Sequence, residues 1–470
     1  MYKKLASDKE NIALLLNEVK QVAMQHFQEI ETVPASAKPR ELKNYKLPKE
    51  GLGAEAVLAH FKTEYQQLMC GSSGPRYWGY VTGGATPASV MGDWLATTFD
   101  QNTQSIKGRG DVSGIMEKET IQLLLEFFNL PKTFYGGFVT GATMSNFTCL
   151  GVARQWVGKN QDYDVALTGL QKPIQVAAGM PHSSVVKGLS MLGIGSTNIH
   201  KIPLLEGREA INVEKLEAFL KQNPTGDVIV LSSAGTVNSV DFDDLEAISK
   251  LKEIYNFWWH IDAAFGGMVA CVEDKKQLIS GWKKADSITV DCHKWLNIPY
   301  DSAVFFVQEK HQKRQVETYQ NSNAPYLGNP MENFTYLNFL PENSRRFRAL
   351  PVWFSLMAYG KKGHQEIVTR NIDLAQQLAN YIETSKDFQL VAPTRVNVVC
   401  FKVVGLSQEK QDLFLTTLNS RRKIFITPSV YNGEACFRAA FVNWQTTQKD
   451  IAIAIKELEA TFQIIKEMKS

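Results

Sequence analysis

The sequence predicts an α/β protein with three parts: an N-terminal helical arm over residues 1–85, a large domain over 86–360, and a smaller C-terminal α/β domain over 361–470. The large domain is expected to contain a doubly wound, mostly parallel sheet, because strand-like and helical segments alternate from about residue 86 to residue 310. Polar motifs directly follow several of its apolar runs. Since the carboxyl ends of parallel strands meet at one edge of such a sheet, we expect a binding site there.

Composition narrows the class of protein. A hydrophobic fraction of 44% with 21% charged residues is ordinary for a globular enzyme. A net charge of +3 without a basic block argues against nucleic-acid binding. No apolar run reaches membrane-spanning length, and we find no signal-peptide pattern. Six scattered cysteines without a CxxC pair favour free thiols, and therefore a cytoplasmic protein.

The N-terminal arm has the pattern of an amphipathic helix followed by a Pro- and Lys-rich link near residues 34–50. The apolar residues that share one face are Ile12, Leu15, Leu16, Val19, Val22, Ala23 and Phe27. Such a helix is not stable alone, so it must pack either on its own domain or on another subunit.

A glycine-rich loop over residues 136–146 leads into a predicted helix. Small residues before a helix expose backbone N–H groups to an anion at the positive end of the helix dipole. The loop is therefore a candidate phosphate site, although a glycine-rich turn by itself is more often only a turn.

His182 follows the apolar run 174–178, and Ser183 and Ser184 are typical residues of a helix start. An imidazole at this junction faces the ligand edge of the sheet and can stack on a flat ring. The alternative is an ordinary core or surface histidine.

Asp262 ends the apolar strand that begins at Trp258. Its carboxylate can hold a proton on the nitrogen of a pyridine ring, and the small Ala264 after it leaves room for a ring face. For an isolated aspartate at this place, a helix cap or a turn is the commoner use.

Lys294 follows another apolar run, in the motif Asp291-Cys292-His293-Lys294. Burial lowers the pKa of a lysine, and a neutral amine condenses with an aldehyde to form a Schiff base. With Asp262 on a neighbouring strand, this lysine indicates pyridoxal phosphate. A snorkelling surface lysine is the alternative for Lys294 alone.

These motifs together resemble the group II pyridoxal-phosphate-dependent decarboxylases, the family of aromatic-L-amino-acid decarboxylase, from about residue 74 to residue 446. The resemblance implies the transferase-like fold type I of pyridoxal enzymes. It implies that Ala142 and Thr143 contact the phosphate, that Asp291 and His293 lie in the cofactor site, and that Thr236, or else Val237, lies near the 3′ oxygen. The family usually has glutamate where this chain has Met144.

The resemblance also implies the reaction: decarboxylation of an L-amino acid to the amine and carbon dioxide, with a Schiff base on Lys294, in a homodimer with shared active sites. Counting back from the family landmark that begins at Arg345 places the catalytic loop tyrosine at Tyr336, with Tyr319 and Tyr326 as rivals. That phenol would donate the proton that replaces the carboxylate, across the dimer interface. Related enzymes with phenylalanine there form aldehydes by oxidative deamination, so a tyrosine favours simple decarboxylation.

Substrate contacts are expected from the segment that contains Trp78 and Tyr80, although both rings are equally suited to an interface core. Val81 and Thr82 depart from the residues of aromatic-selective relatives, so acidic, diamino or small amino acids stay open as substrates. Arg438 is a candidate for binding a substrate carboxylate, as an aminotransferase requires. Alternatives to decarboxylation are transamination, oxidative deamination, lyase cleavage and a non-catalytic scaffold.

Overall fold

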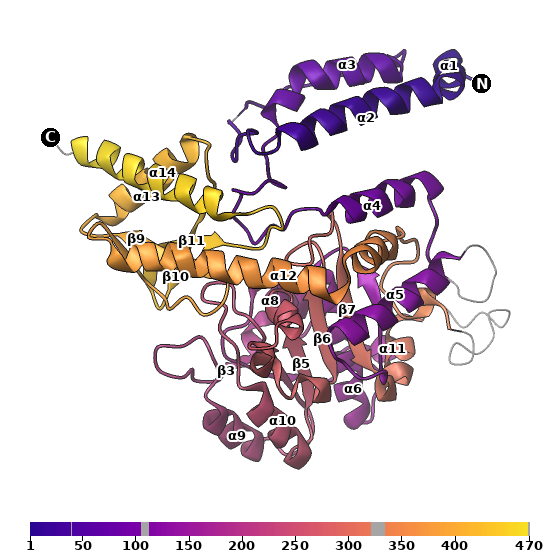
Figure 1. Ribbon diagram of the computed structural model, residues 1–470. Coiled ribbons are helices and arrows are strands. Elements are labelled where there is room, and N and C mark those ends of the chain that lie inside the picture. The colour runs from indigo at the N-terminus through magenta and orange to yellow at the C-terminus, as the bar shows by residue number, and fades with distance from the viewer. Residues whose placement is uncertain (39, 105–111, 321–333, 469–470) are drawn as a thin grey trace.

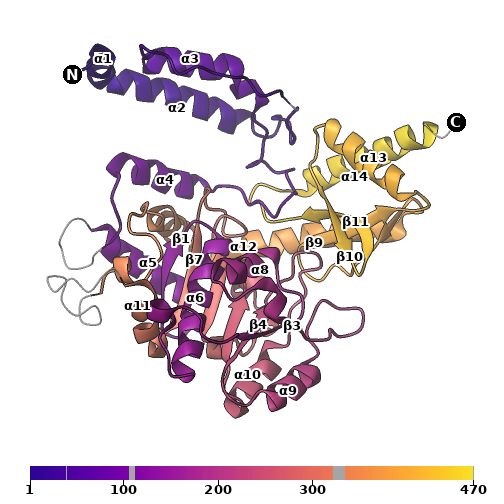
Figure 2. The same cartoon turned by 180° about the vertical axis from the view of Figure 1, so that it is seen from behind.

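The computed structural model describes residues 1–38, 40–104, 112–320 and 334–468. They form a large domain around a seven-stranded sheet, a smaller domain around a four-stranded sheet, and a helical arm that stands apart from both (Figures 1 and 2). The predicted α/β class and the three kinds of substructure are therefore observed, while the boundaries at residues 85 and 360 stay predictions.

The large sheet has the order β1-β7-β6-β5-β4-β2-β3. Its neighbours from β3 to β6 pair in parallel, whereas β7 runs antiparallel to both β1 and β6. The strands are β1 (Phe134–Val139), β2 (Gln175–Ala178), β3 (Ile199–Lys201), β4 (Val228–Ser233), β5 (Trp258–Asp262), β6 (Ser287–Asp291) and β7 (Ala303–Gln308). The central strands β4 and β6 are buried along nearly their whole length, because helices cover both faces of the sheet.

Helices of the large domain connect these strands and fix the polar motifs at their ends. They are α4 (Pro87–Phe99), α5 (Ser113–Phe127), α6 (Ala142–Asn160), α7 (Val165–Thr168), α8 (Ser183–Met191), α9 (Val213–Gln222), α10 (Leu245–Ile254) and α11 (Gln312–Tyr319). Helix α6 begins three residues after β1 and packs across the middle of the sheet, with α8 beside it (Figure 2). The predicted helix start at Ser183 is confirmed, since His182 is the N-cap of α8.

The smaller domain contains an antiparallel sheet in the order β10-β11-β9-β8. Its strands are β8 (Phe388–Leu390), β9 (Val398–Val403), β10 (Thr427–Tyr431) and β11 (Glu434–Ala440), and its helices are α13 (Gln408–Ser420) and α14 (Gln448–Glu467). The long helix α12 (Ala349–Thr384) joins the two domains (Figure 1). It changes direction at Gly360, whose φ of 56° suits glycine because a side chain would be strained there.

The arm comprises α1 (Lys3–Glu10), α2 (Ile12–Glu29) and α3 (Ala54–Glu64), none of which has a buried residue. Its exposed apolar side chains include Leu5, Ile12, Leu14, Leu16, Val19, Met24 and Phe27. The end of α2 and helix α4 form the two sides of an apolar groove of about 410 Å³, lined by Phe27, Met91 and Trp94 among others. The amphipathic helix is therefore present, but its own chain leaves most of its apolar face uncovered.

Candidate active site

A cavity of about 450 Å³ opens at the carboxyl ends of β4 and β5, where the small domain meets the sheet edge. Five residues predicted for the site lie in its wall: His182, Thr236, Asp262, Ala264 and Lys294. The wall is completed by Val81, Met180, Pro181, Ser183, Glu209, Ser233, Gly235, Val237, Asn238 and Phe265, and by Ser429, Val430 and Arg438 of the small domain.

Asp262 is the last residue of β5 and is held by two donors. Its Oδ1 accepts the backbone N–H of Ala264 at 3.1 Å, and its Oδ2 accepts the side-chain amide of Asn146 at 3.1 Å. Ala264 lies beside it with 8% of its surface exposed. A flat ring in this cavity thus finds a small side chain next to a fixed carboxylate.

His182 is anchored through one ring nitrogen. The backbone N–H of Ser184 donates to its Nδ1 at 3.2 Å, and the Ser184 hydroxyl lies 2.7 Å from the same nitrogen. Desolvation lowers the pKa of His182, and the nearby charges of Lys294 and Arg438 add to this effect, whereas the charge of Asp262 opposes it. The ring is therefore neutral with its hydrogen on Nε2, which suits stacking on an electron-poor ring.

Lys294 lies in the loop after β6, and a close backbone approach fixes this loop. Gly83 donates its N–H to the His293 carbonyl at 3.3 Å, and a Cβ at position 83 would lie 1.9 Å from the Lys294 carbonyl oxygen. Only glycine fits there. The side chain of Lys294 is left in the cavity wall with its amine 3.8 Å from Asp291 Oδ2.

The start of α6 brings together the other residues predicted for the cofactor. The carboxylate of Asp291 accepts the N–H of Ala142 at 3.3 Å and the N–H of His293 at 3.2 Å, and the His293 Nε2 lies 3.1 Å from Asp291 Oδ1. Burial raises the pKa of Asp291. Thr143 lies in the first turn of α6, where N–H groups lack partners within the helix and can bind an anion.

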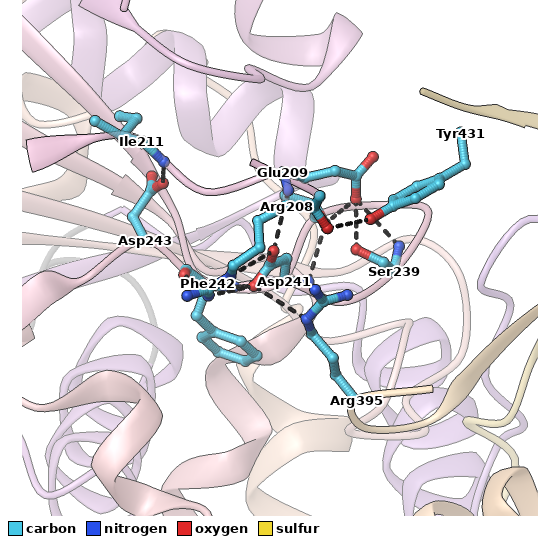
Figure 3. A network of polar contacts seen from close by, with 11 residues as sticks. Arg208, Glu209, Ile211, Ser239, Asp241, Phe242, Asp243, Arg395 and Tyr431 are labelled. Carbon is cyan, nitrogen blue, oxygen red and sulfur yellow. Dashed lines mark hydrogen bonds and ion pairs between the residues drawn. The ribbon is translucent and has the colours of Figure 1, made fainter. Parts of the chain in front are cut away.

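Thr236 lies in the cavity wall, but its hydroxyl has another partner than the one predicted. It donates to the carboxylate of Glu209, which also accepts the hydroxyl of Ser239 at 2.8 Å and the amide of Asn238 at 3.0 Å. The buried Glu209 holds this loop in place, next to the ion pairs of Asp241 (Figure 3). Thr236 thus lies at the predicted site with its hydroxyl bound to Glu209, and its contact with a cofactor oxygen stays a prediction.

One arginine and one tyrosine of the smaller domain, Arg395 and Tyr431, contact loops of the large domain. Asp241 binds Arg208 at 2.6 Å and lies 3.4 Å from Arg395, which precedes β9 (Figure 3). The Tyr431 hydroxyl, from β10, donates to the Gly207 carbonyl at 3.0 Å. These contacts fix the outer wall of the cavity against the sheet edge.

Arg438, from β11, is 8% exposed and reaches the cavity from the small domain. Its Nη1 donates to the Val237 carbonyl at 3.2 Å, while its Nε is buried without a hydrogen-bond partner. It is the one arginine among the residues of this wall.

The two aromatic residues predicted to contact the substrate are not in the cavity wall. Trp78 is 1% exposed, donates to the Pro75 carbonyl at 2.8 Å and packs on Phe441 in the core of the small domain. Tyr80 is 64% exposed. Its neighbour Val81 lines the cavity instead, with a φ of 57° that is strained for a β-branched residue and is typical of functional sites.

The predicted loop tyrosine, Tyr336, does not line this cavity either. Tyr336 is 1% exposed, and its ring centre lies 4.8 Å from the guanidinium of Arg345 within the core of the large domain. Arg345 is itself buried in an ion pair with Glu117 at 2.6 Å. Tyr336 also borders a second cavity, of about 930 Å³, beside α5 and β1. In this chain it does not line the active-site cavity, and its role as the proton donor stays a prediction. Of the rivals, Tyr319 is partly buried against α6 and its hydroxyl donates to the Thr148 carbonyl, whereas Tyr326 lies outside the described residues.

Asn146 and His260 are site residues for which the sequence gave no role. Asn146 joins Asp262 to His260, whose Nε2 lies 2.8 Å from the amide oxygen. Both are fully buried polar side chains, Asn146 on a helix of small and apolar residues and His260 in an apolar strand. That placement was the available signal, because buried polar groups require partners.

The donor set fits pyridoxal phosphate. An amine, a carboxylate and a neutral imidazole line one cavity, and the orphan N–H groups of a helix start lie at the end where Lys294 meets Asp291. In the described ranges, no group of histidine, cysteine, aspartate or glutamate side chains is arranged to hold a metal ion. A search of the helices in those ranges likewise found none with the length and apolarity that a membrane crossing requires.

Comparisons with known proteins agree with this geometry. An aromatic-L-amino-acid decarboxylase of Bacillus atrophaeus is 26% identical over 96% of this chain and 97% of that protein, and a phenylacetaldehyde synthase of Arabidopsis thaliana is 23% identical over 82% and 81%. The structure of Oryza sativa TDC with PLP and tryptamine superposes with a TM-score of 0.88 at 19% identity, covering 98% of this chain and 99% of that one. Mouse CSAD gives a TM-score of 0.84 at 21% identity, over 97% and 99%. These two likenesses show the fold, as predicted.

Residues 34–404 match the family model of the pyridoxal-dependent decarboxylase conserved domain. The match extends over most of the chain and includes every predicted cofactor residue. The chain therefore belongs to the pyridoxal-dependent decarboxylases, and it is a carboxy-lyase whose cofactor is pyridoxal 5′-phosphate.

Proposed function

We propose that this enzyme converts an L-amino acid to its amine and carbon dioxide, with the cofactor bound to Lys294. The observation that carries the proposal is the meeting of Lys294, Asp262, His182 and Arg438 in one cavity. When bound, pyridoxal phosphate withdraws electrons from the bonds of the substrate α-carbon. The protein selects which bond breaks by orienting the substrate.

Each side chain has a distinct part in this proposal. Lys294 supplies the amine that holds the cofactor, and Asp262 keeps a proton on the ring nitrogen. His182, neutral and fixed through Nδ1, covers one face of the ring. Arg438 offers a partly unpaired guanidinium to the substrate carboxylate, because its Nε lacks a partner.

Transamination is the second candidate, and Arg438 is the observation that favours it. In transamination, an arginine binds the substrate carboxylate, so that this group is kept while the amino group is transferred. The two reactions differ in their products, since transamination forms a keto acid and consumes a second one, whereas decarboxylation releases carbon dioxide.

We further propose that the enzyme acts as a homodimer. The uncovered apolar face of α2 and the groove between α2 and α4 support this, because exposed apolar surfaces of this extent mark association sites. A second copy that supplies the same surface closes a two-fold interface. We also propose a cytoplasmic location, which the six free cysteines support.

The test is a panel of aromatic, acidic, diamino and small L-amino acids with the cofactor-loaded enzyme. Carbon dioxide, amine and oxygen uptake are measured together. Carbon dioxide with an equal amount of amine and without oxygen uptake supports decarboxylation and identifies the substrate. Aldehyde with oxygen uptake, or a keto acid without carbon dioxide, contradicts it and identifies the reaction that occurs instead.

A further inference from the structure

The side-chain amide of Asn146 connects the two residues that border the cofactor ring. Its Nδ2 donates to Asp262 Oδ2 at 3.1 Å and to the Ser184 hydroxyl at 3.3 Å, and that hydroxyl lies 2.7 Å from His182 Nδ1. We propose that Asn146 is a positioning residue that orients Asp262 and His182 together, and that His260 fixes the direction of its amide. This inference goes beyond the proposed reaction and rests only on the cofactor site.

The contact with Asp262 fixes the orientation of the Asn146 amide. An ionised carboxylate only accepts hydrogen bonds, so the nitrogen of the amide, not its oxygen, faces Asp262. Asn146 holds Oδ2 while the Ala264 N–H holds Oδ1. With one donor on each oxygen, the carboxylate cannot turn away from the ring nitrogen without breaking a hydrogen bond.

The second N–H of the same amide reaches His182 through Ser184. Because the Ser184 backbone N–H donates to His182 Nδ1, this nitrogen carries no hydrogen. The Ser184 hydroxyl must then donate to Nδ1, and its oxygen is left to accept from Asn146. One amide thereby sets both the carboxylate and the plane of the imidazole.

On the opposite side, His260 holds the amide oxygen. His260 Nε2 lies 2.8 Å from Asn146 Oδ1, so Nε2 carries the hydrogen. Its Nδ1 then accepts the hydroxyl of Ser287 at 2.9 Å, and the Ser287 oxygen accepts Trp258 Nε1–H at 3.0 Å. Burial lowers the pKa of His260 to about 4, so the ring keeps one neutral tautomer at working pH.

A reversed amide would be penalised at both ends. Its oxygen would face the Asp262 carboxylate, and its NH2 group would face the N–H of His260. Because Asn146, His260, Ser287 and Trp258 are all fully buried, no water compensates for such losses. The hydrogen bonds from Trp258 through Ser287, His260 and Asn146 therefore have a single consistent set of directions. This chain of hydrogen bonds ends at Asp262 and, through Ser184, at His182.

The first experiment measures the dissociation constant of the cofactor by absorbance titration of the apoenzyme. It compares wild type with Asn146→Ala and with the control Ser145→Ala. Ser145 is equally buried in the same turn, but its hydroxyl binds Thr289 at 2.9 Å and the Val304 carbonyl at 3.1 Å, away from the cavity wall. The titrations are repeated with the carbocyclic analogue of pyridoxal phosphate, in which carbon replaces the ring nitrogen.

The expected result is a loss of affinity for pyridoxal phosphate of about tenfold or more in Asn146→Ala, as for a lost hydrogen bond to a charged group. The loss for the carbocyclic analogue should be clearly smaller, because this ring makes no ion pair with Asp262. Ser145→Ala should stay within about twofold of wild type for both ligands. Equal losses for the two ligands, or equal losses in both variants, would overturn the proposal.

Thermal unfolding of the apoenzyme shows whether Asn146→Ala folds. If it does not fold, two variants of His260 provide an independent test. His260→Gln keeps an N–H donor near the position of Nε2, whereas His260→Leu removes it. We expect Gln to retain cofactor affinity close to wild type and Leu to lose about tenfold. Equal affinities in the two variants would contradict the role of His260. Both tests are independent of carbon dioxide release, so the proposed reaction and this inference can fail separately.

Discussion

The carboxylate of Asp291 lies 3.8 Å from the amine of Lys294 and at the same time accepts the first N–H of α6, from Ala142. One negative charge thus lies between the amine that holds the cofactor and the helix start that is predicted to hold its phosphate. A phosphate at that helix start experiences repulsion from Asp291 unless the carboxyl is protonated.

Replacing this charge should strengthen anion binding. In Asp291→Asn, the side-chain oxygen still accepts the Ala142 N–H while the like charge is gone, so we expect a lower dissociation constant for both inorganic phosphate and pyridoxal phosphate. Isothermal titration of the apoenzyme measures both. Weaker binding of both ligands would show that Asp291 supports the phosphate site through its charge.

Lys294→Ala should reduce carbon dioxide release by roughly three orders of magnitude or more, because the covalent anchor of the cofactor is lost. Lys187→Ala is the matched control, since Lys187 is an exposed lysine of α8 near His182. Initial rates at saturating cofactor make the comparison. Full turnover by Lys294→Ala would remove the lysine from the mechanism.

We favour Tyr326 as the proton donor in this test, because Tyr336 is 1% exposed and the hydroxyl of the partly buried Tyr319 donates to the Thr148 carbonyl. Tyr326→Phe should therefore lower amine formation and raise aldehyde formation with oxygen uptake, as in the relatives that carry phenylalanine. Tyr336→Phe should leave the product ratio unchanged. If only Tyr336→Phe changed the products, Tyr336 would be the proton donor, and it would have to leave its buried position during the reaction.

The buried Asp286 gives a prediction for stability. It binds Lys252 at 2.6 Å, Lys310 at 2.9 Å and His311 at 2.7 Å. Burial alone would raise the pKa of Asp286, but the hydrogen bond from His311 and the two lysine charges outweigh burial and hold the pKa below its usual range. The ionised carboxylate therefore stabilises the fold above the ordinary aspartate pKa of about 4, and this contribution is lost as the pH falls.

Asp286→Asn should cost about 3–5 kcal/mol near neutral pH, since it leaves the largely buried Lys252 without its counter-charge. The difference from wild type should shrink below about pH 4, where the wild-type contribution fades. Thermal unfolding across this pH range measures it. Glu273→Gln, in an exposed pair with Lys276, serves as the control and should change little. A difference that did not depend on pH would indicate a packing effect instead.

Association of two chains is tested at the groove between α2 and α4. Trp94→Glu places a charge in this apolar groove, so we expect a shift from dimer to monomer in size-exclusion chromatography with light scattering. Leu167→Glu, at an 81% exposed site on α7, is the control and should leave the assembly intact. A monomeric wild type at the same concentration would contradict the proposed homodimer.

The sequence was sufficient for those residues whose positions follow from local rules. Asp262 ends β5, whereas Lys294 and His182 come three and four residues after the ends of β6 and β2, and parallel strands bring their ends to one edge. Trp78 could not be placed in this way, because its partner Phe441 comes from a domain that only the folded chain brings near. Tyr336 was selected by counting from Arg345, and a count cannot show that the ring packs on that same arginine. The partners of Asn146 were equally hidden, since His260 lies 114 residues away in the chain.

The N-terminal region is held by contacts with residues of the smaller domain, and this has a consequence for synthesis of the protein. Arg76 binds Asp450, 374 residues later, and Ala35 donates its N–H to the Arg422 carbonyl. At ~5–20 residues per second, the ribosome needs on the order of 20–75 s to deliver these partners after the arm has emerged. Until then, the segment that follows α2 lacks the small-domain partners that hold it, while the apolar side chains of α2 stay exposed. We therefore expect the nascent chain to bind chaperones, and a chain truncated before residue 422 to aggregate.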